Sequence, residues 1–542
     1  MSSASKTRGS AISTHPCVSF IDARSAPRVM FAGDRLVEAD LPVGTRCIYP
    51  KPPITGLKDP DAAIRYALNH PYNSPPLYAK LRPGMKVVIA LDDISLPLPP
   101  MRKPDVRERV LTIVLQLLED HGVDDVEIII ATSLHRRMTG PEIEHIVGGR
   151  IFAKYYPKRL YNHDAEDPKG MALVGETDRG EKVIINKKAA ESDLLIYVNL
   201  NLVPMDGGHK SVTVGLCGYE SLKPHHNPYV MSDPHTYMDP KVSALAKVVE
   251  RMGKVTNAKL NVFTIETTIN NRMFDAPLAF LAKNEDDYTP AEKTALKALM
   301  FTLDHTPQEL RQAIFSRVPS PYEITGVFAG ETEAVHEHTL KKCFEQYCVP
   351  VEGQADIVIS GIPFISPYNV NAFLNPLLVQ VMAQGYLYNL HRGAPLLKKG
   401  GTLIVTHPCT DKFDQDQHIS YIDFVHKLLP ETRNAQELHQ RYEHQYAANP
   451  AHIEQYRFGH AYHPAHAFFM WYWGEAGRQH IGRVIVVGAD NEYIPKLLGY
   501  ETAQTMADAI RMAQTTAPAA PQITFVHTAP IVMADVTIPG AS

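Results

Sequence analysis

The hydrophobic pattern becomes regular between residues 84 and 135. The runs GMKVVIALDD (84–93) and VEIIIATSLH (126–135) are apolar and rich in valine and isoleucine, and residues 104–121 lie between them. That middle segment repeats apolar residues at the i, i+3, i+4, i+7 spacing of one helix face, and Gly122 follows it. It predicts an amphipathic helix between two strands, as in a parallel sheet covered on both faces.

A second strand, helix and strand pattern occupies the C-terminal half. Residues 355–361, 400–408 and 482–490 are predicted strands with nearby glycines, and residues 375–391 are a predicted long helix. The segment AQTTAPAAPQ (513–522) predicts a linker before a last strand-like run.

Residues 284–318, between these two regions, are rich in charged residues and predict helices. Two helix starts are expected at Thr289-Pro290 and Thr306-Pro307, with threonine as the cap and proline in the first turn. The patterns together predict an α/β protein of two α/β domains with largely parallel sheets and the active site in the cleft between them. We expect the domains to span 1–285 and 286–542, because 542 residues exceed what one core usually supports.

Polar and ionisable residues follow directly after the predicted strands. LDDISLPLPP and ATSLHRRMTG continue from the first two strands, and a third strand (192–201) leads into DGGHKSVTVGLCGYESLKPHHN, residues 206–227. Open α/β sheets bind ligands beyond the carboxyl ends of their strands. The three loops are therefore expected to form one site.

Composition limits the partners. With 54 basic and 59 acidic residues the formal net charge is −5, which argues against a nucleic-acid surface or an anionic membrane and favours a small-molecule substrate. No apolar run is long enough for a membrane span or a signal peptide, so a cytoplasmic location is expected. The six cysteines form no CxxC pair and are expected to be buried thiols.

Several common motifs are absent from the sequence. GGHKS resembles the end of a phosphate-binding loop, but it lacks the required spacing, and Gly215, Gly218 and Pro224 argue against a following helix. Its glycines are expected to let the backbone approach a flat or phosphorylated group. There is also no HExxH, no GxGxxG after a strand and no GxSxG, so a conventional zinc enzyme, dehydrogenase or hydrolase is disfavoured.

Taken in order, several short motifs resemble the nickel-dependent lactate racemase family. They are LDDISLPLP, LHRRMT, NHD, GETDRGEKVIIN, GGHKS and HHN, followed by VFAGETEAVHEHTLKKCFEQYCVPVEGQADIVISGIP and GGTLIV. The resemblance extends over roughly residues 85 to 490 and agrees with the two-domain α/β architecture.

The resemblance implies a nickel-pincer nucleotide, a pyridinium-3,5-dithiocarboxylate-type mononucleotide that carries nickel. It implies that Lys210, preceded by Gly207 and Gly208, tethers this cofactor, and that His226 binds the nickel. Sulfur and imidazole ligands suit a tetragonal nickel site. His135 corresponds to an acid–base histidine of the family. Cofactor-biosynthesis enzymes are implied partners.

Asp93 and Thr139 are expected to contact the cofactor or to orient the groups that do. Trp471, in FFMWYWGE, is the expected match for a tryptophan wall of the family, and a core position is the alternative.

The sequence departs from the family where a second catalytic histidine is expected. Met205 stands at that position. The candidates to replace this histidine are His209, which we take as the second catalytic residue, together with His225 and His163.

Polar substrate anchors of the family are also missing. Leu96 corresponds to a carboxylate-binding arginine, and Leu374 and Leu377 correspond to a glutamine and a lysine. An apolar pocket does not offset the desolvation of a carboxylate, so lactate itself is not the expected substrate.

The sequence therefore predicts a nickel-pincer nucleotide-dependent racemase or epimerase acting by hydride transfer on a 2-hydroxy acid or a related secondary alcohol. The alternative is a non-catalytic member of the family that binds the cofactor or the metal.

Overall fold

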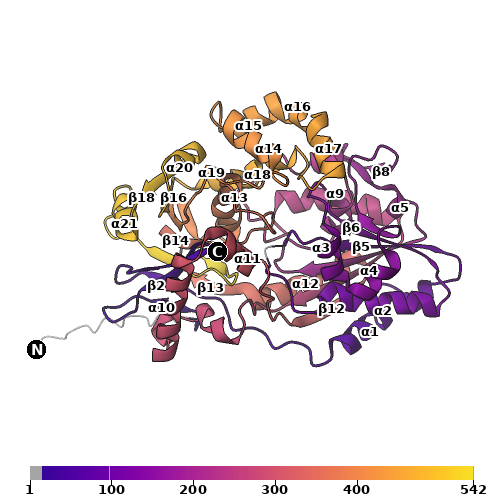
Figure 1. Cartoon of the computed structure of the whole chain (residues 1–542), viewed down its shortest axis with the longest axis horizontal. Coiled ribbons are helices and arrows are strands. Elements are labelled where there is room, and N and C mark those ends of the chain that lie inside the picture. Colours follow the sequence, from indigo (N-terminus) through magenta and orange to yellow (C-terminus); the bar gives the residue numbers. More distant parts are fainter. Residues whose placement is uncertain (1–14, 97, 541–542) are drawn as a thin grey trace, which may run out of the picture.

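The computed structural model describes residues 15–96 and 98–540. Two large sheets organise the chain, one of six strands in the order β12-β11-β10-β5-β6-β7 and one of nine strands. Helices surround both sheets (Figure 1). The predicted α/β class with largely parallel sheets is confirmed.

Parallel strands make up most of the six-stranded sheet. The parallel strands are β5 (Lys86–Asp92), β6 (Asp125–Ala131), β7 (Leu160–Asn162), β10 (Leu194–Asn201) and β11 (Val262–Ile269), and only β12 (Ile324–Gly330) is antiparallel. All eight residues of β10 are buried, as expected for a central strand covered on both faces.

The predicted helix between the first two strands forms as α2 (Val106–Asp120). Asp105 caps it, because its side chain accepts a hydrogen bond from the Arg107 amide, and the apolar positions Val110, Val114 and Leu118 are buried. This helix connects β5 to β6 and sets the direction in which both strands end.

The nine-stranded sheet combines the two ends of the chain. Its central strands are parallel: β14 (Ala355–Pro363), β16 (Leu397–Thr406), β17 (Arg483–Val487), β18 (Glu501–Ala503) and β19 (Ile523–Val526). The N-terminal strands β1 (Val18–Phe20), β2 (Arg28–Gly33), β3 (Arg35–Ala39) and β4 (Arg46–Ile48) belong to the same sheet. In particular, β4 pairs with β19, and β2 pairs with the end of β14.

The division between the sheets therefore does not follow the boundary expected at residue 285. Residues 18–48 lie in the C-terminal sheet, whereas β12 and α12 (Thr332–Tyr347), which come after residue 285, pack on the N-terminal sheet. Strand pairing between distant segments leaves no local sequence signal that would have shown this exchange.

Other predicted elements differ from the structure in their ends. Thr289 caps α10 (Pro290–His305) as expected, but Pro307 precedes α11 (Gln308–Phe315), and the Thr306 hydroxyl donates backwards to the Thr302 carbonyl instead of capping. The 375–391 helix begins as α13 (Pro376–Gln380) and continues as a π-helical segment, Val381–Leu387.

The stretch that follows β10 contains two short helices, α6 (Lys210–Gly215) and α7 (Tyr219–Leu222), where a loop was expected. Gly215 and Gly218 end α6 and precede α7, so these glycines limit the length of the helices and do not prevent them. Lys210 is thereby fixed at the first turn of a helix.

Candidate active site

The carboxyl ends of β5, β6 and β10 meet at one cavity of about 170 Å³. Polar groups from all three strand ends line it: Asp92, Asp93, Ser133, His135, Asn199, Asp206 and Lys210. Residues 363–368 and 382–390 of the C-terminal half complete its wall. The structure therefore brings the three predicted loops together, at an interface between the two halves of the chain.

The Asp93–His135 pair is the best defined polar contact in this cavity. Asp93 Oδ2 lies 2.9 Å from His135 Nδ1, and the amide and hydroxyl of Ser95 donate to the same carboxylate. Burial acts to raise the pKa of Asp93, but His135 and Ser95 hold it below its usual value. An ionised carboxylate only accepts, so His135 Nδ1–H donates to it, and Nε2 is the acceptor in the neutral form of the ring.

Asp92, the neighbour of Asp93, is held differently. It accepts hydrogen bonds from the Leu200 amide at 2.7 Å and from the Tyr197 hydroxyl at 3.1 Å. Burial and the nearby Asp206 carboxylate raise the pKa of Asp92 to about 7. Two adjacent carboxyl groups in one wall thus differ in charge near neutral pH, because only Asp93 has an imidazole partner.

The glycine pair before Lys210 makes a tight turn. Gly207 has φ +85° and Gly208 has φ +59°, a region that side chains disfavour. The Gly208 amide donates to Glu266 Oε1 at 2.6 Å, and a Cβ on Gly207 would lie 2.5 Å from that same oxygen. The close approach expected of these glycines is thus made to the protein's own buried Glu266.

Lys210 lines the cavity, and Asp206, one turn earlier, is its nearest acid. Its Nζ lies 3.9 Å from Asp206 Oδ1, a separation at the outer limit of an ion pair. Asp206 also accepts from the Leu202 and Val203 amides; burial raises its pKa although the charge of Lys210 acts against this. No other carboxylate is within ion-pair distance of Lys210 among the described residues.

His226 is buried and is not among the residues that line this cavity, and a second histidine contacts its ring. Its Nδ1 lies 2.6 Å from Nδ1 of His225, and its Nε2 has no hydrogen-bond partner in the described chain. Burial, together with the charges of His225, Lys210 and His135, holds the pKa of His226 well below its usual value. A neutral ring with one nitrogen anchored and the other free has the form of a metal-ligating imidazole.

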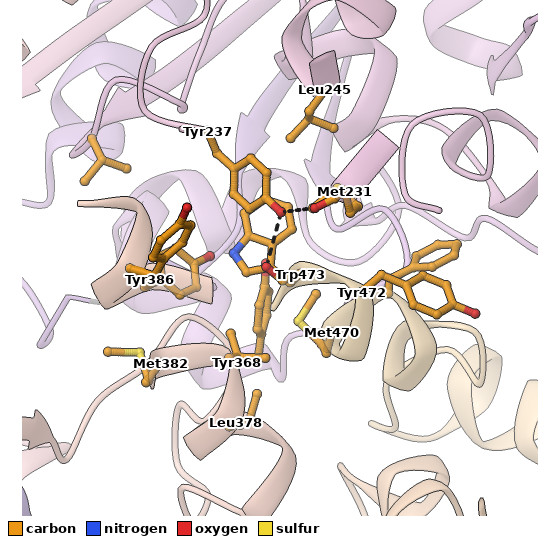
Figure 2. Close-up of a cluster of buried hydrophobic side chains, with 14 of the residues drawn as sticks. Met231, Tyr237, Leu245, Tyr368, Leu378, Met382, Tyr386, Met470, Tyr472 and Trp473 are labelled. Carbon is orange, nitrogen blue, oxygen red and sulfur yellow. Dashed lines mark hydrogen bonds between the residues drawn. The ribbon is translucent and has the colours of Figure 1, made fainter. Parts of the chain in front are cut away.

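The tryptophan against His226 is Trp473. Their ring centroids are 5.8 Å apart at 27°, and Figure 2 shows Trp473 packed beside Tyr237 and Tyr386. Trp471, which was expected here, instead donates to the Arg433 carbonyl and packs under the Arg478 guanidinium. The two tryptophans are two positions apart and leave α18 (His466–Trp473) in different directions.

Two further predicted residues lie outside the cavity wall. The Thr139 hydroxyl accepts from the Glu142 amide and completes a capping box at the start of α3 (Gly140–Val147). His209 Nε2–H donates to Glu333 Oε1 at 2.9 Å, and the ring packs against Gly253 of α9 (Ala244–Lys259). His209 thus turns away from the cavity that Lys210 faces.

The other candidates for the second acid–base histidine are also engaged elsewhere. His163 Nε2–H donates to the Cys217 carbonyl, and Asn186 Nδ2 donates to its Nδ1, so both nitrogens are used. His225 is the partner of His226. Met205 and Leu96 do line the cavity, whereas Leu374 and Leu377 are buried in the core.

A histidine that the sequence reasoning missed lies against His135. The rings of His135 and His466 are 5.3 Å apart at 89°. The Tyr421 hydroxyl lies 2.6 Å from His466 Nδ1 and has no other acceptor in the described chain, so it donates and leaves the ring proton on Nε2. Burial and the neighbouring histidines hold the pKa of His466 well below its usual value.

These two rings are complementary, because His135 Nε2 is an acceptor and His466 Nε2–H is a donor. His466 begins an otherwise apolar run, HAFFMWYW, in α18. A histidine in such a run was the available signal, but only the fold brings it to His135, more than 300 positions away in the sequence.

Within residues 15–96 and 98–540, no group of three or more His, Cys, Asp or Glu side chains is placed to hold a metal ion. None of the helices in these ranges is both long and apolar enough to cross a membrane.

Comparison with known proteins agrees with this arrangement. Residues 33–239 match the lactate racemase N-terminal domain family. The lactate racemase of Lactiplantibacillus plantarum is 28% identical over 177 residues, which are 32% of this chain and 39% of that protein. The lactate racemase of Thermoanaerobacterium thermosaccharolyticum is 24% identical over 176 residues, with the same two coverages of 32% and 39%. The alignments therefore span less than half the length of these relatives.

Solved structures extend the likeness of fold to nearly the whole chain. The lactate racemase apoprotein from T. thermosaccharolyticum matches with a TM-score of 0.61 and 18% identity, over 94% of this chain and 100% of that one. A protein from Thermotoga maritima matches with a TM-score of 0.50 and 13% identity, over 90% and 100% of the two chains. Residues 33–239 are therefore similar to the lactate racemase N-terminal domain family, and the fold of nearly the whole chain is that of the lactate racemase apoprotein.

Proposed function

We propose that this chain is a racemase or epimerase-like isomerase that moves a hydride at a secondary alcohol, such as a 2-hydroxy acid or a related compound other than lactate. The observation that carries the proposal is the Asp93–His135 pair in the wall of the cavity that Lys210 also lines. An anchored imidazole with a free Nε2 suits removal of a hydroxyl proton.

The residues around the cavity fit a tethered nickel-pincer nucleotide. Lys210 would hold it, since its Nζ reaches the cavity and has only the distant Asp206 as partner. His226 would bind the nickel through its free Nε2, and because no cluster of three protein ligands exists in the described ranges, the remaining ligands would come from the cofactor. When bound, this cofactor supplies an acceptor and donor of hydride.

The protein's own residues move the proton. His135 Nε2 takes the hydroxyl proton while the hydrogen on the carbinol carbon leaves as hydride, which produces a planar ketone. Return of the hydride to the opposite face, with return of a proton to oxygen, inverts the centre. His466 Nε2–H is a hydrogen-bond donor next to His135. The largely apolar walls exclude water from the ketone.

The test is to produce the chain together with the cofactor-making enzymes and to measure nickel content, the mass of the Lys210 peptide and hydrogen exchange at the carbinol carbon over a panel of hydroxy acids. We expect nickel and added mass in the wild type, loss of both in Lys210→Arg, and loss of nickel alone in His226→Ala. Lys223→Arg, which changes a lysine outside the cavity lining, is the matched control. Wild-type protein with neither nickel nor added mass would contradict the proposal.

A second candidate is a non-catalytic member that binds the cofactor or the metal. It is favoured by Met205 and Leu96, because the described residues that line the cavity include neither a second histidine nor an arginine for a small carboxylate. His135→Ala separates the two. An isomerase keeps its nickel and loses exchange, whereas a binding protein keeps its nickel and has no exchange to lose.

A further inference from the structure

We infer that a second cavity, which shares wall residues with the first, binds the far end of an elongated substrate in which an apolar spacer joins the reacting alcohol to an anionic group held by Arg317. The inference rests on the proposed function for the position of the alcohol beside His135. It adds the substrate class, which neither the family match nor the solved structures describe.

The second cavity has a volume of about 360 Å³ and shares part of its wall with the first. The shared residues are Asp93, Leu96, Leu98, Leu200 and Ile365. Its other walls come from α3, from residues 312–317 in and after α11, and from residues 364–372. Leu96 and Leu98 therefore face both spaces, and we infer that a long ligand passes these two side chains.

The first cavity offers no site for a carboxylate. Among the described residues, Lys210 is the only lysine or arginine that lines it. This lysine faces Asp206 and is the proposed cofactor tether. Most of the remaining wall consists of leucine, methionine, isoleucine, proline and tyrosine side chains. A carboxylate placed there would lose its hydration without gaining a cation, which is unfavourable by several kcal/mol. Within the proposed class of substrates, this favours a secondary alcohol whose anionic group lies outside this space over a 2-hydroxy acid.

Of the charged side chains that line the second cavity, one cation has no acidic partner. Arg107 binds Asp105 through two nitrogens at 2.9 Å, and of the other carboxylates in the wall, Asp93 faces His135 and Glu142 faces Arg136 at 2.7 Å. Arg317 is an exposed residue that lines this cavity, and its guanidinium has no ion-pair or hydrogen-bond partner in the described chain. It is the group in either cavity best able to bind an anion.

An apolar surface lies between His135 and Arg317. Leu96, Leu98 and Ile365 belong to both cavities, and Phe315 and Phe364 stack with ring centroids 4.0 Å apart in the second. These side chains suit methylene or aromatic groups, which gain free energy when they leave water.

The test is a binding titration that needs neither cofactor nor turnover. We would titrate the full chain by calorimetry with 3-hydroxybutanoate, 5-hydroxyhexanoate and 9-hydroxydecanoate, in which the alcohol stays next to the terminal methyl group while the spacer to the carboxylate lengthens. We expect affinity to rise along the series in the wild type, and Arg317→Ala to weaken the longest carboxylate by about tenfold, as for the loss of one charge-assisted hydrogen bond.

Two controls isolate the cause. The methyl ester of 9-hydroxydecanoate should bind wild type and Arg317→Ala equally, and Lys297→Ala, which removes an exposed cation outside both cavities, should bind the carboxylate like the wild type. Leu98→Trp should weaken the longest probe by narrowing the passage. Unchanged binding of 9-hydroxydecanoate to Arg317→Ala, or the absence of any rise with spacer length, would overturn the inference, whether or not the chain is an isomerase.

Discussion

The chemistry available to each histidine near the cavity is decided by the partner of one ring nitrogen. His135 meets an ionised carboxylate and is left with an acceptor at Nε2, whereas His466 receives the Tyr421 hydroxyl and is left with a donor. His163, at the end of the neighbouring strand β7, uses both nitrogens for the protein itself. Residue type alone, which is what the sequence shows, does not separate these three cases.

Asp92 gives a prediction at this scale. Its folded pKa of about 7 lies above the value near 4 expected in an unfolded chain, so the folded protein binds the extra proton and loses stability as pH rises between those values. Asp92→Asn removes that loss. We therefore expect the stability of the variant relative to wild type to increase from pH 5 to pH 7 and then level off, by at most about 1.4 kcal/mol per pH unit.

Urea unfolding at pH 5, 6, 7 and 8 measures this difference. Asp93→Asn is the control of opposite sign, because the pKa of Asp93 is lowered. Its contribution is complete above the unfolded pKa, so its loss should be constant from pH 5 to pH 8. A difference for Asp92→Asn that does not change with pH would argue against a raised pKa.

At the scale of elements, the turn between β10 and α6 determines where Lys210 lies. The chain reverses through Gly207 and Gly208, and the Gly208 amide is held by Glu266 of β11. This contact connects the start of α6 to a buried strand. A helix end fixed in this way presents Lys210 to the cavity in one orientation.

Gly208→Ala should destabilise this turn in two ways. Alanine at φ +59° carries the backbone strain of the left-handed region, about 1–2 kcal/mol, and its Cβ would lie 2.8 Å from His336 Cδ2. Gly84→Ala is the matched control, since Gly84 has φ +78° and no atom within 4 Å of the added Cβ. We expect a larger drop in the free energy of unfolding for Gly208→Ala than for Gly84→Ala. Equal losses for the two variants would mean that the His336 side chain moves away from the added Cβ without an energetic penalty.

The elements with strong local signals were predicted well. The apolar runs at β5, β6 and β10 and the amphipathic pattern of α2 define their own structure. The ends of elements were predicted less well. Thr306 does not cap α11, and the helix after Asn375 becomes π-helical, because packing against neighbouring segments outweighs the local preference.

At the scale of the whole molecule, the N-terminal strands are held in the C-terminal sheet by buried charges. Arg28 of β2 is fully buried and contacts Asp286 at 2.7 Å and Glu285 at 3.4 Å. Glu285 also accepts from the Val29 amide and the Tyr49 hydroxyl. The expected boundary would assign residues 28 and 285 to the N-terminal domain. Both instead contact each other at the nine-stranded sheet of the C-terminal half.

Arg28→Met should therefore lower the free energy of unfolding by about 3–5 kcal/mol, because it leaves buried carboxylates without their cation. The control is Arg35→Met in the next strand, where an exposed pair with Asp304 at 4.0 Å should contribute no more than about 1 kcal/mol. Urea unfolding of both variants gives the comparison. A small loss for Arg28→Met would mean that residues 18–48 are attached to the sheet mainly by their strand pairing.

The sequence by itself determined the α/β class, the strand ends that carry polar residues, and the placement of Asp93, His135 and Lys210 at one cavity. These follow from local periodicity and from the rule that parallel strands end at one edge. Only the tertiary structure decided the exchange of strands across residue 285, the packing of Trp473 against His226, and the approach of His466 to His135. Each of these depends on contacts between segments far apart in the chain, and no local pattern of hydrophobic and polar residues encodes such contacts.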